Sequence, residues 1–118
     1  MKGNISIYMC YKENSVFLKE ENRDGYIVSA LMKKVWAVEL DLLSELDRVC
    51  KKYNIKYYAA FGTLLGAVRN KGFIPWDDDI DVCMLRDDYA KFKEVAKNEF
   101  GGKYYYQDWY NSCGRIKE

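Results

Sequence analysis

The sequence of 118 residues contains no histidine, a single proline and no long hydrophobic run. The lack of histidine excludes catalytic schemes in which an imidazole acts as the general base. No stretch approaches the roughly 20 apolar residues that a membrane-spanning helix needs. The apolar stretch ISIYMCY near the N-terminus is too short for a signal peptide with its cleavage site. We therefore predict a protein with no transmembrane segment and a cytoplasmic location.

The cysteines and the net charge exclude further classes of protein. The four cysteines lie thirty or more residues apart, with no CxxC pair, so a structural zinc site is not predicted. Cys50 and Cys83 lie within apolar patterns and are expected to be buried. The formal net charge is +1, so no overall field favours binding to nucleic acid. The informative features of this sequence are its local patterns and motifs.

Hydrophobic periodicity predicts a long amphipathic helix from Ala30 to Tyr53, with Ser29 as its N-cap. Its expected buried face consists of apolar residues three and four positions apart: Leu31, Val35, Val38, Leu42, Leu46, Val49 and Tyr53. Before this helix, residues 1–25 form a poorly determined extended or irregular segment with a turn at Asn22 to Gly25.

Shorter elements follow the long helix. The expected order is a buried strand at 55–61, a short helix over 63–70, a strand at 79–84, an amphipathic helix at 86–100 and an aromatic strand within 101–110. Thr63 is the expected N-cap of the short helix, and Gly72 lies just past its end. Tyr89, Phe92 and Phe100 are among the residues expected to face inward from the last helix. The strands at 55–61 and 79–84 are predicted neighbours in one small mixed sheet, which gives an α+β or α/β class.

The stretch IPWDDDIDV, residues 74–82, places four carboxylates within five positions. Two unit charges about 6 Å apart repel by roughly 0.7 kcal/mol in water, so the cluster needs solvation, protonation or a cation. Residues two apart in a strand share a face about 6.5–7 Å apart. Asp79 and Asp81 are therefore expected to project together, joined by Asp77, while Asp78 points away. Carboxylate-only ligation favours Mg²⁺ or Mn²⁺.

The acidic stretch has other possible interpretations. A solvated acidic loop after the proline turn is the plain alternative. An EF-hand loop counted from Asp77 would need glycine and glutamate where Val82 and Asp88 stand. The string also matches the DDxxD of prenyl-diphosphate enzymes, but that motif lies on a helix of a larger helical fold. A glycosyltransferase-type DxD would need a nucleotide-binding half upstream, for which the chain has no room.

The stretch FGTLLGAVRNKG, residues 61–72, places Gly62 and Thr63 between a strand and a helix. Free N–H groups at a helix start and a threonine hydroxyl suit phosphate, although most such helix starts are only structural. Arg69 and Lys71 add positive charge near the helix end. A phosphate site beside a carboxylate strand is the arrangement that binds a nucleotide's diphosphate through Mg²⁺.

The stretch GTLLGAVRNKGFIPWDDDIDV, followed by RDDYAKF, closely resembles the LicD family, whose relatives include the fukutin-type transferases. The resemblance covers roughly residues 24–118. It implies a nucleotidyltransferase-like fold in which Gly62 and Thr63 are the glycine signature, Asp79 and Asp81 are the catalytic metal carboxylates and Asp77 lies near the metal. It also implies transfer of phosphocholine or a similar group from a CDP-activated donor to a cell-surface glycan, at the inner face of the membrane.

The sequence departs from the family in two ways. Asn70 stands where many members carry a histidine. Members are also usually much longer, so residues 1–118 are expected to form one incomplete domain that lacks a later carboxylate and the acceptor-binding part. A missing C-terminal half or a partner chain would supply them. Two other hypotheses stay open: a remnant that binds metal and nucleotide without turnover, and a calcium-binding or scaffold module.

Overall fold

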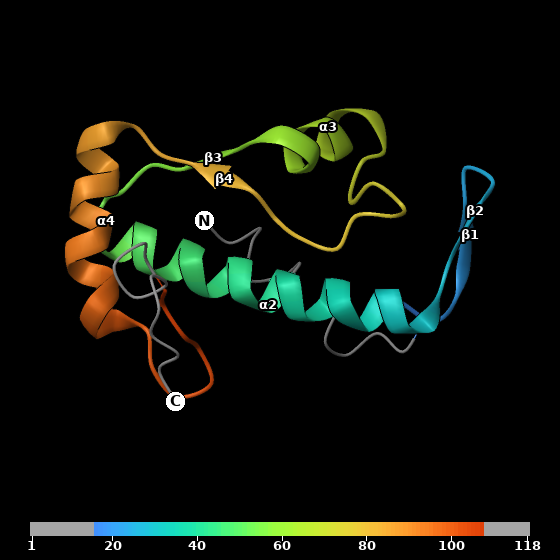
Figure 1. The fold of residues 1–118 in the computed structure, drawn as a ribbon, viewed down its shortest axis with the longest axis horizontal. Helices are drawn as coiled ribbons and strands as arrows, with labels where there is room; N and C mark the ends of the chain where they lie inside the picture. The colour runs from blue at the N-terminus through green and yellow to red at the C-terminus, as the bar shows by residue number, and fades with distance from the viewer. Residues whose placement is uncertain (1–15, 108–118) are drawn as a thin grey trace.

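The computed structural model describes residues 16–107, in which helices combine with two antiparallel strand pairs (Figure 1). The α+β class is thereby confirmed. The elements in chain order are β1 (Glu21–Arg23), β2 (Tyr26–Val28), α2 (Ala30–Lys52), β3 (Tyr58–Ala59), α3 (Phe61–Arg69), β4 (Val82–Cys83) and α4 (Arg86–Glu99). None of the helices in residues 16–107 is long and apolar enough to cross a membrane.

A hairpin of β1 and β2 precedes the long helix. The predicted turn is confirmed: the Gly25 N–H donates to Asn22 Oδ1 at 2.9 Å, and Asp24 and Gly25 both have positive φ. Such a turn matches the twist of the two strands that it joins. From Glu21 onward the segment predicted to be irregular is therefore a hairpin, and residues 1–15 of that prediction lie outside the described residues.

The long helix α2 begins and ends as predicted. Ser29 Oγ accepts from the Met32 N–H at 3.1 Å, and Asn54 adopts a left-handed conformation just past the end. The predicted buried face is wrong for the first half, where Leu31 and Val38 are exposed. The helix buries instead Lys33, Trp36, Asp41, Val49 and Cys50.

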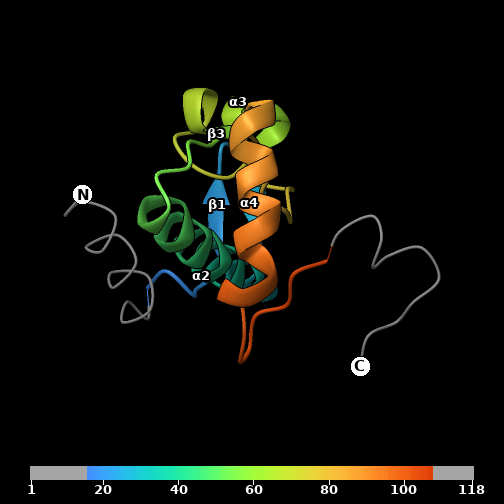
Figure 2. The ribbon, with the colours of Figure 1, turned by 90° about the vertical axis from the view of Figure 1, so that its left-hand side faces the viewer.

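The two halves of α2 bury different kinds of residue because they pack against different neighbours. Near its C-terminal end, Val49 and Cys50 form the core with Ile55 and with Phe92 and Ala96 of α4. Figures 1 and 2 show α4 standing across that end of α2. Near its N-terminal end, α2 packs against the β1–β2 hairpin and residues 73–77 through polar and aromatic groups. Lys33 and Trp36 make these contacts through an ion pair, a hydrogen bond and ring stacking. Hydrophobic periodicity does not predict such contacts, because it considers only the spacing of apolar residues.

The strands β3 and β4 pair antiparallel, with Tyr58 opposite Cys83 and Ala59 opposite Val82. The predicted neighbouring strands are thus confirmed but are shorter than expected. β3 ends because α3 begins at Phe61, which leaves no partner for the residues before Asp81. Cys83 is exposed rather than buried, and residues 104–107 of the predicted aromatic strand contain no strand.

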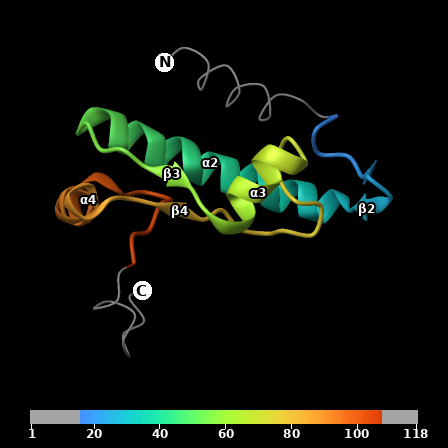
Figure 3. The ribbon, with the colours of Figure 1, turned by 90° about the horizontal axis from the view of Figure 1, so that it is seen from above.

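The helix α3 lies above α2 (Figure 3) with an unexpected orientation. Gly66 is its buried residue, whereas four apolar side chains at helical spacing point outward, namely Phe61, Leu64, Leu65 and Val68. The helix packs through glycine because its neighbour, the chain at residues 72–74, comes too close for a side chain. In α4, Phe92 and Ala96 are buried as predicted, but Tyr89 is half exposed.

Candidate metal and phosphate site

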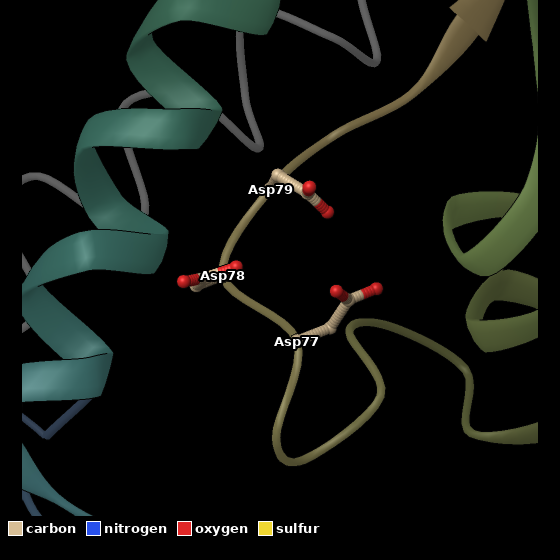
Figure 4. A group of neighbouring side chains, drawn as sticks. All are labelled: Asp77, Asp78 and Asp79. Carbon is tan, nitrogen blue, oxygen red and sulfur yellow. The ribbon is translucent and has the colours of Figure 1, made fainter.

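Three consecutive carboxylates meet on the loop between α3 and β4. One oxygen each from Asp77, Asp78 and Asp79 lies within 4.8 Å of the others (Figure 4). The Asp79 carboxylate turns toward that of Asp77, whereas Asp78 extends toward α2. Hereafter these three residues are called the acidic cluster. Asp81 does not belong to this group.

The backbone explains why the cluster differs from the predicted strand face. A turn ends at Asp77, whose N–H donates to Ile74 O at 2.9 Å, and Pro75 within the turn is fully buried. Residues 77–81 then continue without strand pairing. Asp78, which was expected to point away, contributes an oxygen to the cluster. Exposed and half-buried positions alternate from Asp79 to Cys83, and the expectation that Asp79 and Asp81 share one face stays a prediction. The metal role predicted for these acids stays a prediction.

Asp81 lies beside the start of α3 and is held there by its backbone. Its N–H donates to Thr63 Oγ1 at 2.8 Å, and its carbonyl accepts from the Ala60 N–H at 3.0 Å. Thr63 is therefore not the N-cap, a position that Ala60 occupies. The Thr63 hydroxyl instead connects the acidic stretch to the glycine turn at Gly62 and Thr63. The predicted metal-binding stretch and the predicted phosphate-binding turn are therefore adjacent.

The acids around the cluster disfavour one another's charge. Partial burial raises the pKa of Asp77, and the adjacent Asp79 carboxyl raises it further. Burial also raises the pKa of Glu39 on α2, and so do the charges of Asp79 and Asp78. Glu39 was missed from the sequence because it lies on a helix forty residues from the cluster, with no local motif. The site is thus a region of mutually repelling carboxylates, a repulsion that a bound cation would reduce.

An open cavity of about 610 Å³ lies between α2 and α3. Four of the predicted site residues line it, namely Gly62, Thr63, Lys71 and Asp77. Arg69 is not among the lining residues, and its Nε donates to Asn70 Oδ1 at 3.1 Å. Asp79 and Asp81 do not line the cavity either.

The cavity also contains residues that the sequence did not reveal. Arg23 of β1 adds a second cation to the wall, and Trp36 and Phe73 add aromatic surface. Arg23 belongs to the turn at Asn22 to Gly25, for which the sequence predicted no functional role. No motif within that turn marks it as part of a site, since its place depends on the packing of the hairpin.

Gly62 is required where the glycine turn meets the acidic cluster. A Cβ at this position would lie 2.7 Å from Asp77 Oδ2. The same region holds backbone strain: Phe61 and Lys71, at the two ends of α3, have φ of 49° and 56°. Bulky residues avoid this left-handed region, and strain of this kind concentrates at functional sites.

Replacement of Gly62 by alanine should displace the Asp77 carboxylate while leaving the fold intact. The clash is with a side-chain atom that can rotate away, so we expect a loss of stability of about 1 kcal/mol or less. The displaced carboxylate should weaken Mn²⁺ binding about tenfold, by analogy with disturbed outer-shell groups of metal sites. Calorimetric titration with Mn²⁺ and thermal melts measure the two effects. Unchanged Mn²⁺ affinity would remove Asp77 from the metal site.

Together the fold and the site define a small α+β domain in which Asp77 of an acidic loop adjoins the glycine-containing start of α3, at the wall of a cavity that Lys71 and Arg23 also line. The chain belongs to the LicD family. Residues 54–113, about half of the chain, match the family described as LicD/FKTN/FKRP, nucleotidyltransferase domain. The resemblance proposed from the motif is thereby confirmed.

Three relatives show how far the similarity extends. The lipopolysaccharide cholinephosphotransferase LicD of Haemophilus influenzae is 54% identical over 56 residues, which cover 48% of this chain and 21% of that protein. An uncharacterized protein of Rickettsia prowazekii is 34% identical over 100 residues, covering 83% and 36%. An uncharacterized protein of Rickettsia typhi is 36% identical over 75 residues, covering 62% and 24%. The chain thus spans roughly a fifth to a third of these relatives. No solved structure matches the chain.

Proposed function

We propose that this chain takes part in the Mg²⁺-dependent transfer of phosphocholine, or a similar phospho-substituent, from a CDP-activated donor to a cell-surface glycan. The acceptor would be lipopolysaccharide, teichoic acid or capsule, modified by a cytoplasmic protein at the inner face of the membrane. Family membership and the name of the Haemophilus relative support the reaction class. The observation that carries the proposal is the Asp77 carboxylate, which joins the acidic cluster to the glycine start of α3.

The donor atoms of the cluster fit Mg²⁺ or Mn²⁺. They are carboxylate oxygens only, two of the three side chains are exposed, and hard divalent cations prefer such ligands. When bound, the metal would neutralise the charge of the donor's pyrophosphate. Asp77 and Asp79 are the proposed ligands, and Asp78 completes the group. A nucleotidyltransferase-like fold in one domain over residues 1–118 is part of the same proposal.

The remaining site residues would orient the donor. Lys71 and Arg23 line the cavity, so their charges would hold the phosphates, together with the N–H groups at the start of α3. The acceptor hydroxyl forms a bond to the phosphorus that carries choline, the bond from that phosphorus to the bridging oxygen breaks, and CMP leaves. Asp79 and Asp81 are the proposed catalytic carboxylates. Asp81, outside the cluster, would accept the hydroxyl proton.

Release of CMP from CDP-choline tests the proposal. The protein, with lipopolysaccharide as acceptor, should release CMP in the presence of Mg²⁺ and should stop when EDTA is added. Phosphocholine should appear on the glycan in equal amount. CMP release that continues in EDTA would contradict the metal role, whereas binding of neither CDP nor Mn²⁺ would contradict the whole proposal.

A second candidate is a module that binds metal and nucleotide without turnover, in a partner subunit or as a remnant of the enzyme. In this candidate the acidic cluster and the cavity would hold metal and nucleotide, and Asp81, which does not line the cavity, would perform no chemistry. Mn²⁺-dependent CDP binding without CMP release would support it. Ca²⁺ binding with no affinity for CDP would instead favour a calcium-binding or scaffold module.

Lys71 and Arg69 should differ in their effect on CDP affinity. Lys71 lines the cavity and has a φ of 56°, a conformation that glycine adopts freely. Lys71→Gly should therefore weaken Mn²⁺-dependent CDP binding about fivefold to tenfold, typical of a lost charge-assisted contact, while raising thermal stability by up to about 1 kcal/mol. Calorimetry and melts measure the two effects.

Arg69→Ala is the matched control for Lys71→Gly. It removes the same charge two residues away, outside the cavity, so CDP affinity at moderate salt should change less than twofold. Equal losses in the two variants would mean that only the general positive charge matters. No loss in either would refute the phosphate role of Lys71.

A further inference from the structure

A buried tryptophan of α2 holds the backbone of the acidic cluster. Trp36 is 1% exposed, and its Nε1–H donates to the carbonyl oxygen of Asp77 at 2.7 Å. The two residues are 41 positions apart in the chain. The bond therefore connects the long helix directly to the loop that carries the predicted metal ligands.

The position of this bond within the loop is specific. The carbonyl of Asp77 belongs to the peptide unit that joins Asp77 to Asp78, so the indole fixes the plane between two acids of the cluster. On the other side of Asp77, its N–H is fixed by Ile74 O at 2.9 Å. Both backbone polar groups of Asp77 are thus bonded, and its carboxylate abuts Gly62. Little freedom remains for this residue.

The indole itself is held firmly. The ring of Phe73 stacks on Trp36 with centroids 4.8 Å apart and an angle of 8° between planes. The Arg23 guanidinium carbon lies 5.0 Å from the indole centroid. Contacts of both kinds add to the free energy of burying the ring. The indole N–H that donates to Asp77 is therefore held in place by the packing of Phe73 and Arg23 on the ring.

The carboxylates of the acidic cluster repel one another, so their close arrangement needs support from the rest of the protein. Two charged carboxylate oxygens within 4.8 Å of each other repel by about 0.9 kcal/mol or more in water and by several times more at lower effective dielectric. Without a metal, this repulsion would drive the cluster apart. A bond from a buried group opposes that motion, and a site held in its bound geometry binds more tightly because less ordering is left to binding.

We propose that Trp36 is a positioning residue for the acidic cluster: through the Asp77 carbonyl it keeps the carboxylates assembled for a divalent cation. This inference rests on the proposed function, since it assigns the cluster to a metal. Trp36 lies outside the segment matched to the family, residues 54–113. The metal site would therefore depend on α2 as well as on residues within the matched segment.

The test compares Mn²⁺ affinity in three proteins by calorimetric titration and electron paramagnetic resonance. Trp36→Phe removes the donor and should weaken Mn²⁺ binding tenfold or more, the range found for groups that orient metal ligands. Trp76→Phe is the matched control, because Trp76 adjoins Asp77 in sequence but is 60% exposed. The Mn²⁺ affinity of this variant should equal that of the wild type. Thermal melts of both variants record the structural effect.

A second variant separates the hydrogen bond from the packing. Replacement of Trp36 by 3-benzothienylalanine keeps the shape of the ring and puts sulfur in place of the N–H. It should weaken Mn²⁺ binding as Trp36→Phe does, and it decides the question if Trp36→Phe fails to fold. Wild-type affinity in the benzothienyl variant would overturn the inference and leave the proposed function standing. A wild-type protein that binds neither Mn²⁺ nor CDP would overturn both.

Discussion

Replacement of Asp77 by asparagine should abolish Mg²⁺-dependent binding of CDP without lowering the stability of the fold. Asp77 is the acid that lies both in the cluster and in the cavity wall. Loss of one ligand from three should reduce metal affinity at least a hundredfold, since the remaining carboxylates bind a hydrated cation only weakly. Calorimetric titration with CDP, in Mg²⁺ and in EDTA, measures the loss.

The stability of the same variant follows from the direction of the pKa shift. The pKa of Asp77 is raised in the folded protein, so the folded state binds this proton more tightly than the unfolded state does. Stability then increases as pH falls through that raised pKa, and the ionised form is the less stable one at neutral pH. Asparagine resembles the protonated acid. We therefore expect an unchanged or slightly higher melting temperature in EDTA at pH 7.

The control for Asp77→Asn is Asp24→Asn. Asp24 lies in the turn between β1 and β2 with a φ of 53°, a conformation that asparagine tolerates equally well. It loses the same charge away from the cavity, so ligand-induced stabilisation should be unchanged. If Asp77→Asn melted well below the wild type in EDTA, Asp77 would be a structural partner, as expected when one member of a buried ion pair is removed. Retention of the wild-type ligand-induced shift would also refute the metal role.

The sequence predicted the elements around the site better than the geometry within it. Ser29 and Asn54 mark the ends of α2 because capping depends on the side chain and the local backbone alone. The breaks at Gly62 and Pro75 predicted that β3 and β4 are neighbours, although not that they pair antiparallel. The gathering of Asp78 with Asp77 and Asp79 was not predicted, because it arises in a loop that follows the buried Pro75 and not in a paired strand.

Contacts that the sequence did not predict share one physical cause. Trp36, Glu39 and Arg23 reach the site from elements far away in the chain. None lies in a local pattern, and a tryptophan on an amphipathic helix predicts only burial. The outward apolar face of α3 is a similar case: helical spacing of apolar residues such as Leu64 and Val68 is typical of a buried face, yet the two glycines on the other face allow the closer approach.

Replacement of Gly66 by alanine should cause the largest loss of stability among single changes near the site. A Cβ there would lie 2.5 Å from the carbonyl oxygen of Gly72 and 3.0 Å from the backbone nitrogen of Ile74. Both are backbone atoms, so no side chain can rotate away. Relief requires the chain at 72–74 to move off α3, which also breaks the bond from the Gly72 N–H to Gly66 O at 3.2 Å.

The balance of terms favours destabilisation. Alanine in place of glycine inside a helix gains about 1 kcal/mol. Forced overpacking costs about 1–3 kcal/mol or more, and a lost hydrogen bond about another 1 kcal/mol. We therefore expect a net loss of about 2 kcal/mol, or roughly 8 °C in melting temperature. Because residues 72–74 lead into the turn that positions Asp77, Mn²⁺ affinity should fall as well.

Gly101→Ala is the control for Gly66→Ala, and chemical denaturation of both variants is the measurement. A Cβ at Gly101 would have no atom within 4 Å, so its free energy of unfolding should stay within about 0.5 kcal/mol of the wild type. A loss of stability in Gly66→Ala alone would show that glycine at this position is what lets α3 pack against the loop of the acidic cluster. If alanine at position 66 were neutral or stabilising, α3 would pack elsewhere, and the closeness of the glycine turn to Asp77 would lose its physical basis.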